Sequence, residues 1–142
     1  MNQVRPHLLW LGNASDGEGF RRLFDLGIDA VVQLSAEEPP LPLPRDLILC
    51  RFPLVDGVGN RPALLSMAIE TAAALVRSRT PTLLCCGAGM SRSPAVAAAA
   101  LTLSYGGPPE DWLKLVTEHH PSDVSPGLWD EVRALLVTPR PA

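Results

Sequence analysis

The sequence CCGAGMSRSP at residues 85–94 carries most of the information about the fold. It follows a short apolar run at 81–85 that begins with proline, and such a run predicts a buried strand. It leads into a run of alanine, valine and leucine at 94–103, which predicts a helix with Pro94 in its first turn. A strand, a glycine-containing loop and a helix N-terminus in this order direct backbone N–H groups and the positive end of the helix dipole to one point, which favours an anion.

The side chains of this loop indicate which anion. Cys86 opens the loop and Arg92 closes it, with five residues between them. A thiolate needs positive charge nearby at neutral pH, and the loop amides, the dipole and Arg92 supply it. The planar fork of an arginine binds two oxygens of a phosphate at once. Gly87 and Gly89 permit the backbone angles of a cradle, and Ser93 is placed to donate a hydrogen bond to the sulfur when it must leave.

This loop resembles the signature of the dual-specificity subgroup of cysteine-dependent protein phosphatases, Cys-x-x-Gly-x-Ser-Arg-Ser. The matching residues are Cys86, Gly89, Ser91, Arg92 and Ser93. The earlier part of the chain is similar to the same family as well, with Gly12-Asn13 after a strand, then a helix, then the strand-like sequence GIDAVV at 27–32. The resemblance therefore covers most of the chain, although its specific part is the loop.

The resemblance implies roles for the loop residues. Cys86 attacks phosphorus and forms a phosphocysteine, and Ser93 helps to release the thiolate. The three equatorial phosphoryl oxygens are bound by the side chain of Arg92 and by the backbone amides of Gly87, Ala88, Gly89, Met90, Ser91 and Arg92. Since arginine and amides supply the charge stabilisation, no metal and no other cofactor is required.

The chain departs from the family pattern at one position of the loop. The family has a histidine immediately before the nucleophile, which the resemblance implies holds the loop backbone, and this chain has Cys85. A thiol is a weak hydrogen-bond partner, so Cys86 is expected to be less acidic than is usual in the family. A redox role for Cys85 is the competing interpretation, but adjacent Cα atoms lie about 3.8 Å apart, below the usual disulfide range of about 4.4–6.8 Å.

Asp56 is the candidate general acid. It follows a predicted strand, lies in the turn-rich sequence LVDGVGN at 54–60 and precedes Cys86 by thirty residues. Phosphoester cleavage needs a proton for the departing oxygen, and a carboxylic acid on a loop can give it. The separation from Cys86 resembles that in the phosphatase family. The alternative is an ordinary turn residue, since Asp-Gly is a common turn pair.

Composition limits the classes of protein that remain. At 142 residues, with 46% hydrophobic and 19% charged residues, the chain is expected to form one globular domain over 1–142. The net charge of −3 argues against a nucleic-acid surface. Three cysteines form no disulfide framework and favour a reduced, cytoplasmic setting. No apolar run is long enough to span a membrane, and no signal peptide is evident. A monomer is expected.

The spacing of apolar residues, and the prolines and glycines that separate the apolar runs, predict an α/β domain with a mostly parallel sheet flanked by helices. The expected strands lie at 7–11, 28–34, 47–52 and 82–85, and the expected helices at 15–26 (capped by Ser15 or Asp16), 62–77 (capped by Asn60), 93–105, 109–118 and 125–137. Residues 35–46 are expected to be irregular and residues 138–142 to be frayed. His119 and His120 are interpreted as a surface turn rather than as metal ligands.

The resulting expectation is a phosphatase acting on phosphotyrosine, on phosphoserine or phosphothreonine, or on small aryl phosphates. Two alternatives remain open. A rhodanese-like sulfurtransferase also has a cysteine in a cradle loop, although the position of Arg92 and the trailing Ser93 argue against it. A non-catalytic phosphate-binding module would keep the loop without efficient turnover. The loop interior carries no lysine, so highly charged inositol phosphates are less suitable ligands.

Overall fold

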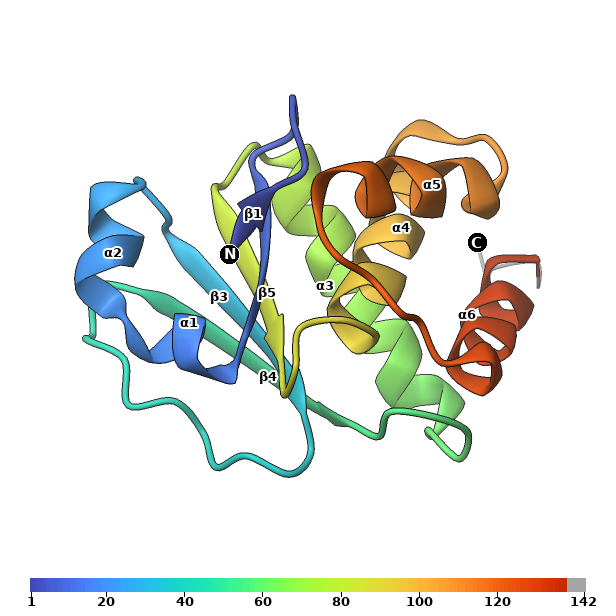
Figure 1. Ribbon diagram of the computed structural model, residues 1–142, viewed down its shortest axis with the longest axis horizontal. Coiled ribbons are helices and arrows are strands. Elements are labelled where there is room, and N and C mark those ends of the chain that lie inside the picture. Colours follow the sequence, from blue (N-terminus) through green and yellow to red (C-terminus); the bar gives the residue numbers. More distant parts are fainter. Residues whose placement is uncertain (138–142) are drawn as a thin grey trace.

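The computed structural model describes residues 1–137, and the expectation for the tail at 138–142 lies outside these residues. A five-stranded sheet forms the centre of the fold, with strand order β1-β2-β5-β3-β4 (Figure 1). β1 is antiparallel to β2, and all the other neighbouring strands are parallel. The strands are β1 (Asn2–Gln3), β2 (Leu9–Asn13), β3 (Ala30–Ser35), β4 (Ile48–Leu54) and β5 (Thr82–Cys86).

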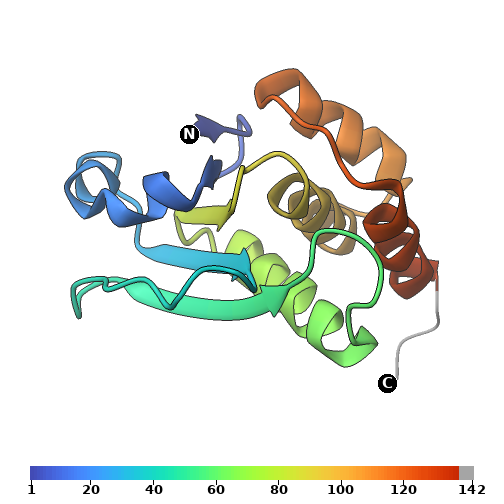
Figure 2. The same ribbon diagram turned by 60° about the horizontal axis from the view of Figure 1, so that its bottom comes forward.

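Helices cover both faces of the sheet. The short helices α1 and α2 lie on one face, and α3 to α6 are gathered on the other (Figures 1 and 2). The helices are α1 (Ala14–Glu18), α2 (Phe20–Asp25), α3 (Pro62–Arg77), α4 (Arg92–Tyr105), α5 (Pro109–His119) and α6 (Pro126–Val137). The predicted α/β class with a mostly parallel sheet is therefore confirmed.

The two faces of the sheet bury two separate apolar clusters. The larger one packs β-strand side chains against α3, α4, α5 and α6, and three alanines of α4 are completely buried in it: Ala97, Ala99 and Ala100. The smaller one lies under α2 and the 36–47 segment. Because successive strand residues point to opposite faces, Cys86 belongs to the larger cluster and Cys85 to the smaller one.

Several predicted boundaries are corrected by contacts between distant segments. The first predicted strand, 7–11, is instead Leu9–Asn13, because Gly12 and Asn13 pair with Cys85 and Cys86 of β5. The strand predicted at 47–52 continues to Leu54 with Pro53 inside it. β4 lies at the edge of the sheet, where proline needs no partner for its missing N–H. β1 was not predicted, since two residues carry no periodicity.

Two predicted helix starts are also corrected. The helix expected at 15–26 is two helices separated at Gly19, and its cap is Asn13 rather than Ser15 or Asp16. The Asn13 side chain accepts a hydrogen bond from the Asp16 N–H, while the Asp16 carboxylate accepts one from the Asn13 N–H. α3 is preceded by Arg61 as its N-cap residue, and Asn60 serves a different purpose described below.

Among residues 1–137, none of the helices has both the length and the apolar character that a membrane crossing requires.

Candidate active site

The segment between β5 and α4 forms a tight loop at the carboxyl end of the sheet. Cys86 is the last residue of β5, and Arg92 is the first residue of α4. Gly89 has φ of +74°, and a Cβ atom at this position would lie 2.6 Å from the carbonyl oxygen of Gly12. Both the backbone angle and the close approach to β2 therefore require glycine at residue 89.

The carbonyl groups of this loop are bound from outside by two segments, the start of α1 and the connection between α5 and α6. They accept hydrogen bonds as follows: Gly87 O from Ala14 N at 3.2 Å, Gly89 O from the His120 ring at 2.6 Å, and Met90 O from Asp123 N at 2.7 Å. A trans peptide is planar, so each N–H points opposite to the carbonyl of the same peptide unit. The N–H groups that follow these carbonyls therefore face away from the surrounding elements, as an anion cradle requires.

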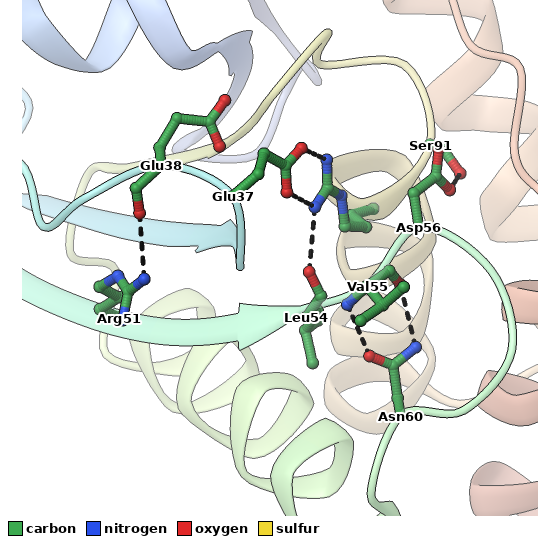
Figure 3. A network of polar contacts seen from close by, with 9 residues as sticks. Glu37, Glu38, Arg51, Leu54, Val55, Asp56, Asn60 and Ser91 are labelled. Carbon is green, nitrogen blue, oxygen red and sulfur yellow. Dashed lines mark hydrogen bonds and ion pairs between the residues drawn. The ribbon is translucent and has the colours of Figure 1, made fainter.

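Arg92 is buried beside this loop, with only 5% of its surface exposed. Its Nη1 donates to Glu37 Oε1 at 2.5 Å and to the carbonyl oxygen of Leu54 at 2.9 Å, and its Nη2 donates to Glu37 Oε2 at 2.6 Å (Figure 3). Its Nε has no partner among the described residues, and neither has the fully buried hydroxyl of Ser93. Two buried donors without a partner, next to one loop, are unusual in a folded protein.

Glu37 orients the guanidinium of Arg92 from the side of the 36–46 loop. The hydrogen bond from Arg92 lowers the pKa of the Glu37 carboxyl below its usual value, and the same bond raises the pKa of Arg92. The loop itself is held by Gln33 of β3, which donates to the Pro39 carbonyl and accepts from the N–H of Leu41. The loop that carries Glu37 is therefore fastened to β3, and Glu37 lies opposite Arg92.

Asp56 contacts the loop between β5 and α4 on the side away from Glu37 (Figure 3). Its Oδ1 accepts a hydrogen bond from the Ser91 hydroxyl at 2.6 Å, and Ser91 Oγ in turn accepts from the N–H of Ser125 at 2.9 Å. Asn60 closes the segment that carries Asp56, with its amide bonded to both backbone groups of Val55 (Figure 3). The side chain of Asp56 is thus held against the loop and remains exposed to solvent.

A cavity of about 380 Å³ lies between these groups. Its lining includes Cys86 and Arg92, which are its most buried members, together with Met90 and three carboxylates. The carboxylates are Glu37, Asp56 and Asp123. The cavity therefore combines a thiol, a buried arginine and a carboxylic acid at its mouth, which is a set of groups suited to attack on a bound anion and to protonation of a leaving group.

Cys85 and Cys86 have different surroundings although they are adjacent. The thiol of Cys85 faces α1, where a Cβ atom added to Gly17 would lie 3.2 Å from its sulfur. Burial, followed by the charge of Cys86, raises the pKa of Cys85 to about 12. The two sulfurs thus belong to opposite faces of the sheet, which opposes a disulfide between them in addition to the short Cα separation.

The structure brings the predicted residues Cys86, Arg92 and Asp56 together around one cavity and buries Ser93 beside them. Sequence reasoning did not identify Glu37 as a partner of Arg92. The two residues are 55 positions apart, and nothing local marks one glutamate of the 36–46 loop over the next. The prediction that His119 and His120 form a surface turn is wrong, since His119 is the last residue of α5, and His120 is buried with a partner for each ring nitrogen.

No family model matches the chain, and no curated protein matches it. Solved structures do. Human DUSP28 is 25% identical over 96% of this chain and 95% of its own, with a TM-score of 0.84. A mouse putative dual specificity phosphatase complexed with zinc tungstate is 26% identical over 94% of this chain and 84% of its own, with a TM-score of 0.83. PTPMT1 is 19% identical over 95% of this chain and 92% of its own, with a TM-score of 0.78.

These similarities extend over nearly the whole of each chain, so they concern the complete architecture rather than the loop alone. The human tyrosine phosphatase-like serine/threonine/tyrosine-interacting protein is also similar, at 20% identity and a TM-score of 0.81 over 94% of this chain and 93% of its own. The protein therefore has the fold of the dual-specificity phosphatases.

Proposed function

We propose that the protein is a cysteine-dependent phosphatase that hydrolyses phosphomonoesters through a phosphocysteine on Cys86. The observation that carries the proposal is the unpaired Nε of Arg92, buried beside a loop whose carbonyls are bound from outside. An unpaired buried donor costs roughly 1–3 kcal/mol. A phosphoryl oxygen would satisfy this donor, and the loop amides would bind the remaining oxygens.

In the first step the Cys86 thiolate attacks phosphorus while the bond from phosphorus to the leaving oxygen breaks. Asp56 gives its proton to that oxygen, so the product leaves as a neutral alcohol or phenol. Arg92 and the N–H groups of residues 87–92 stabilise the charge on the three equatorial oxygens. The enzyme is left with a phosphocysteine and an ionised Asp56.

In the second step a water molecule attacks the phosphocysteine, and Asp56 takes a proton from that water. The bond between sulfur and phosphorus breaks, inorganic phosphate forms, and Cys86 returns as a thiolate. Ser93 donates a hydrogen bond to the departing sulfur and so stabilises its negative charge. The hydroxyl of Ser91 keeps Asp56 in place in both steps, through the 2.6 Å hydrogen bond described above.

The groups around the cavity favour a substrate with one phosphoryl group. Arg92 is the one cationic side chain among the lining residues of the described chain, and three carboxylates share the lining with it. Phosphoproteins and small aryl phosphates fit this charge pattern better than polyphosphates do. A monomer in the cytoplasm is the setting we propose, because a reactive thiolate needs a reducing compartment to stay reduced.

The test compares aryl phosphates whose leaving groups differ in basicity. Cys86→Ser is expected to abolish turnover while tungstate, a phosphate mimic, still binds, because Arg92 and the loop amides remain. Asp56→Asn is expected to slow poor leaving groups by about 10²–10⁴-fold and good ones far less, since only poor ones need the proton. Turnover by Cys86→Ser above a few per cent of wild type would remove Cys86 as the nucleophile.

The two alternatives predict other results from the same purified protein. A rhodanese-like sulfurtransferase would transfer sulfur from thiosulfate to cyanide and leave aryl phosphates intact. A phosphate-binding module would bind tungstate with wild-type Cys86 and show no turnover of any phosphomonoester. The carboxylate at Asp56, placed by Ser91 at the cavity, favours the phosphatase over both.

A further inference from the structure

His120 contacts the loop between β5 and α4 from outside the cavity. It follows the last residue of α5, and the residue is 8% exposed. Nε2 lies 2.6 Å from the carbonyl oxygen of Gly89, and Nδ1 lies 2.8 Å from Nδ2 of Asn2. His120 does not line the cavity, so it acts on the loop and not on a ligand.

The two partners determine which ring nitrogen carries the proton. The amide nitrogen of Asn2 can only donate, so Nδ1 of His120 accepts. The carbonyl of Gly89 can only accept, so Nε2 carries the proton and donates. Asn2 is itself placed by the pairing of β1 with β2, opposite Leu11. A short strand that sequence periodicity did not reveal therefore sets the orientation of the histidine.

The hydrogen bond from His120 reaches the residue of the loop whose backbone conformation is most restricted, Gly89. Gly89 has a positive φ and lies against the Gly12 backbone. The carbonyl of Gly89 and the N–H of Met90 belong to one planar peptide unit. When His120 holds that carbonyl on the outside, the N–H of Met90 points away from His120 and toward the cavity side, which Met90 lines.

The residue before Cys86 offers no such support. The Cys85 sulfur faces α1 on the opposite side of the sheet, and a thiol is a weak donor. We propose that His120, oriented by Asn2, is a positioning residue that fixes the peptide between Gly89 and Met90 and so aims the Met90 N–H at the phosphoryl group. This inference rests on the proposed phosphatase function and adds to it the part of the molecule that keeps the cradle in shape.

The experiment compares His120→Leu, which cannot donate, with His120→Gln, whose side-chain amide can. Two quantities are measured: kcat and KM for an aryl phosphate, and the tungstate Kd of the same variants carrying Cys86→Ser. A misplaced loop costs up to about 100-fold in rate, so His120→Leu is expected to lower kcat and weaken tungstate binding by about 10- to 100-fold. His120→Gln is expected to restore both to within a few-fold of wild type.

His119→Leu is the matched control, because His119 is the neighbouring residue and its ring is hydrogen-bonded to the Leu115 carbonyl of its own helix rather than to the loop. It is expected to leave kcat and the tungstate Kd unchanged.

Wild-type values in a folded His120→Leu protein would overturn the proposal, as would equal losses in the leucine and glutamine variants. If His120→Leu does not fold, Asn2→Ala takes its place, with an expected loss of several-fold in both quantities; unchanged values overturn the proposal. A wild-type protein without turnover would instead refute the proposed function itself.

Discussion

Arg92 and Glu37 form an ion pair of unequal burial. The side chain of Arg92 is 6% exposed and that of Glu37 is 55% exposed. Replacing Glu37 by glutamine leaves a buried guanidinium with fewer acceptors, which costs about 1–3 kcal/mol. We therefore expect Glu37→Gln to lower the free energy of unfolding by this amount at pH 7, and to lower kcat because the guanidinium loses its orientation.

The pH dependence of this loss has a definite sign. The pKa of Glu37 is lowered in the folded chain from the ordinary 4.5, mainly by the hydrogen bond from Arg92. The ion pair thus contributes its full stability above pH 4.5 and loses it as the pH falls through the lowered folded value. Denaturant unfolding of wild type and Glu37→Gln from pH 7 to pH 3 is expected to show a difference that shrinks only at the acidic end.

The exposed pair of Arg133 and Glu110 provides the control. Its atoms are 2.6 Å apart, but both side chains are about half exposed, at 52% and 48%. Exposed pairs are worth at most about 1 kcal/mol, so Glu110→Gln is expected to change the free energy of unfolding less than Glu37→Gln does. Equal losses for the two variants would mean that the burial of Arg92 does not matter.

At the scale of elements, the segment from β4 to α3 carries Asp56 and is tied to α6. Glu131 of α6 accepts hydrogen bonds from the N–H groups of Gly59 and Asn60 at 2.8 and 3.3 Å and from the Asn60 amide at 3.2 Å. Removing these acceptors should let the segment move and misplace the acid. We expect Glu131→Ala to slow aryl phosphates with poor leaving groups by about tenfold, a fraction of the roughly 10²–10⁴-fold that a general acid contributes.

The neighbouring Asp130→Ala serves as the control, since Asp130 is exposed on the same helix. It is expected to leave turnover of every leaving group unchanged. A loss in Glu131→Ala that is the same for good and poor leaving groups would show that Glu131 does not act through Asp56.

The elements predicted best are those with purely local signals. β5, the following loop and α4 were predicted to within one residue at each boundary, because proline, glycine and apolar runs mark them directly. The helix expected at 15–26 was predicted as one piece, although Gly19 divides it and only Leu23 of its four apolar residues is buried. Its phenylalanines, Phe20 and Phe24, are 40% and 45% exposed.

The parts of the site that the sequence did not reveal are contacts across long separations. The sequence suggests Asn60 as a helix cap, with Pro62 in the first turn of the helix, but the Asn60 amide closes the Asp56 segment instead. The sequence places His120 in a surface turn because two adjacent histidines have no partners at metal-ligand spacing, but its ring bonds to residues 31 and 118 positions away. Short polar side chains suit caps and tertiary bonds equally well, so local pattern cannot separate the two.

At the scale of the whole molecule, charge around the cavity should select among phosphorylated substrates. The chain has a net charge of −3, and the cavity is lined by three carboxylates and one arginine that is already paired with Glu37. Basic residues next to the phosphate are attracted by this charge, and acidic ones are repelled. Exposed charge pairs contribute about 0.2–1 kcal/mol each, so kcat/KM for phosphopeptides with basic flanks should exceed that for acidic flanks by about two- to fivefold.

The measurement uses two phosphopeptides that differ only in the sign of their flanking charges, at low and high salt. Because Asp123 is exposed at the cavity, Asp123→Asn is expected to reduce the ratio of the two kcat/KM values, and salt is expected to reduce it further by screening. Asp25→Asn removes the same charge from α2, whose residues are not among those that line the cavity, and should leave the ratio unchanged. A preference for the acidic peptide, or a ratio that salt does not affect, would contradict selection by the carboxylates of the cavity.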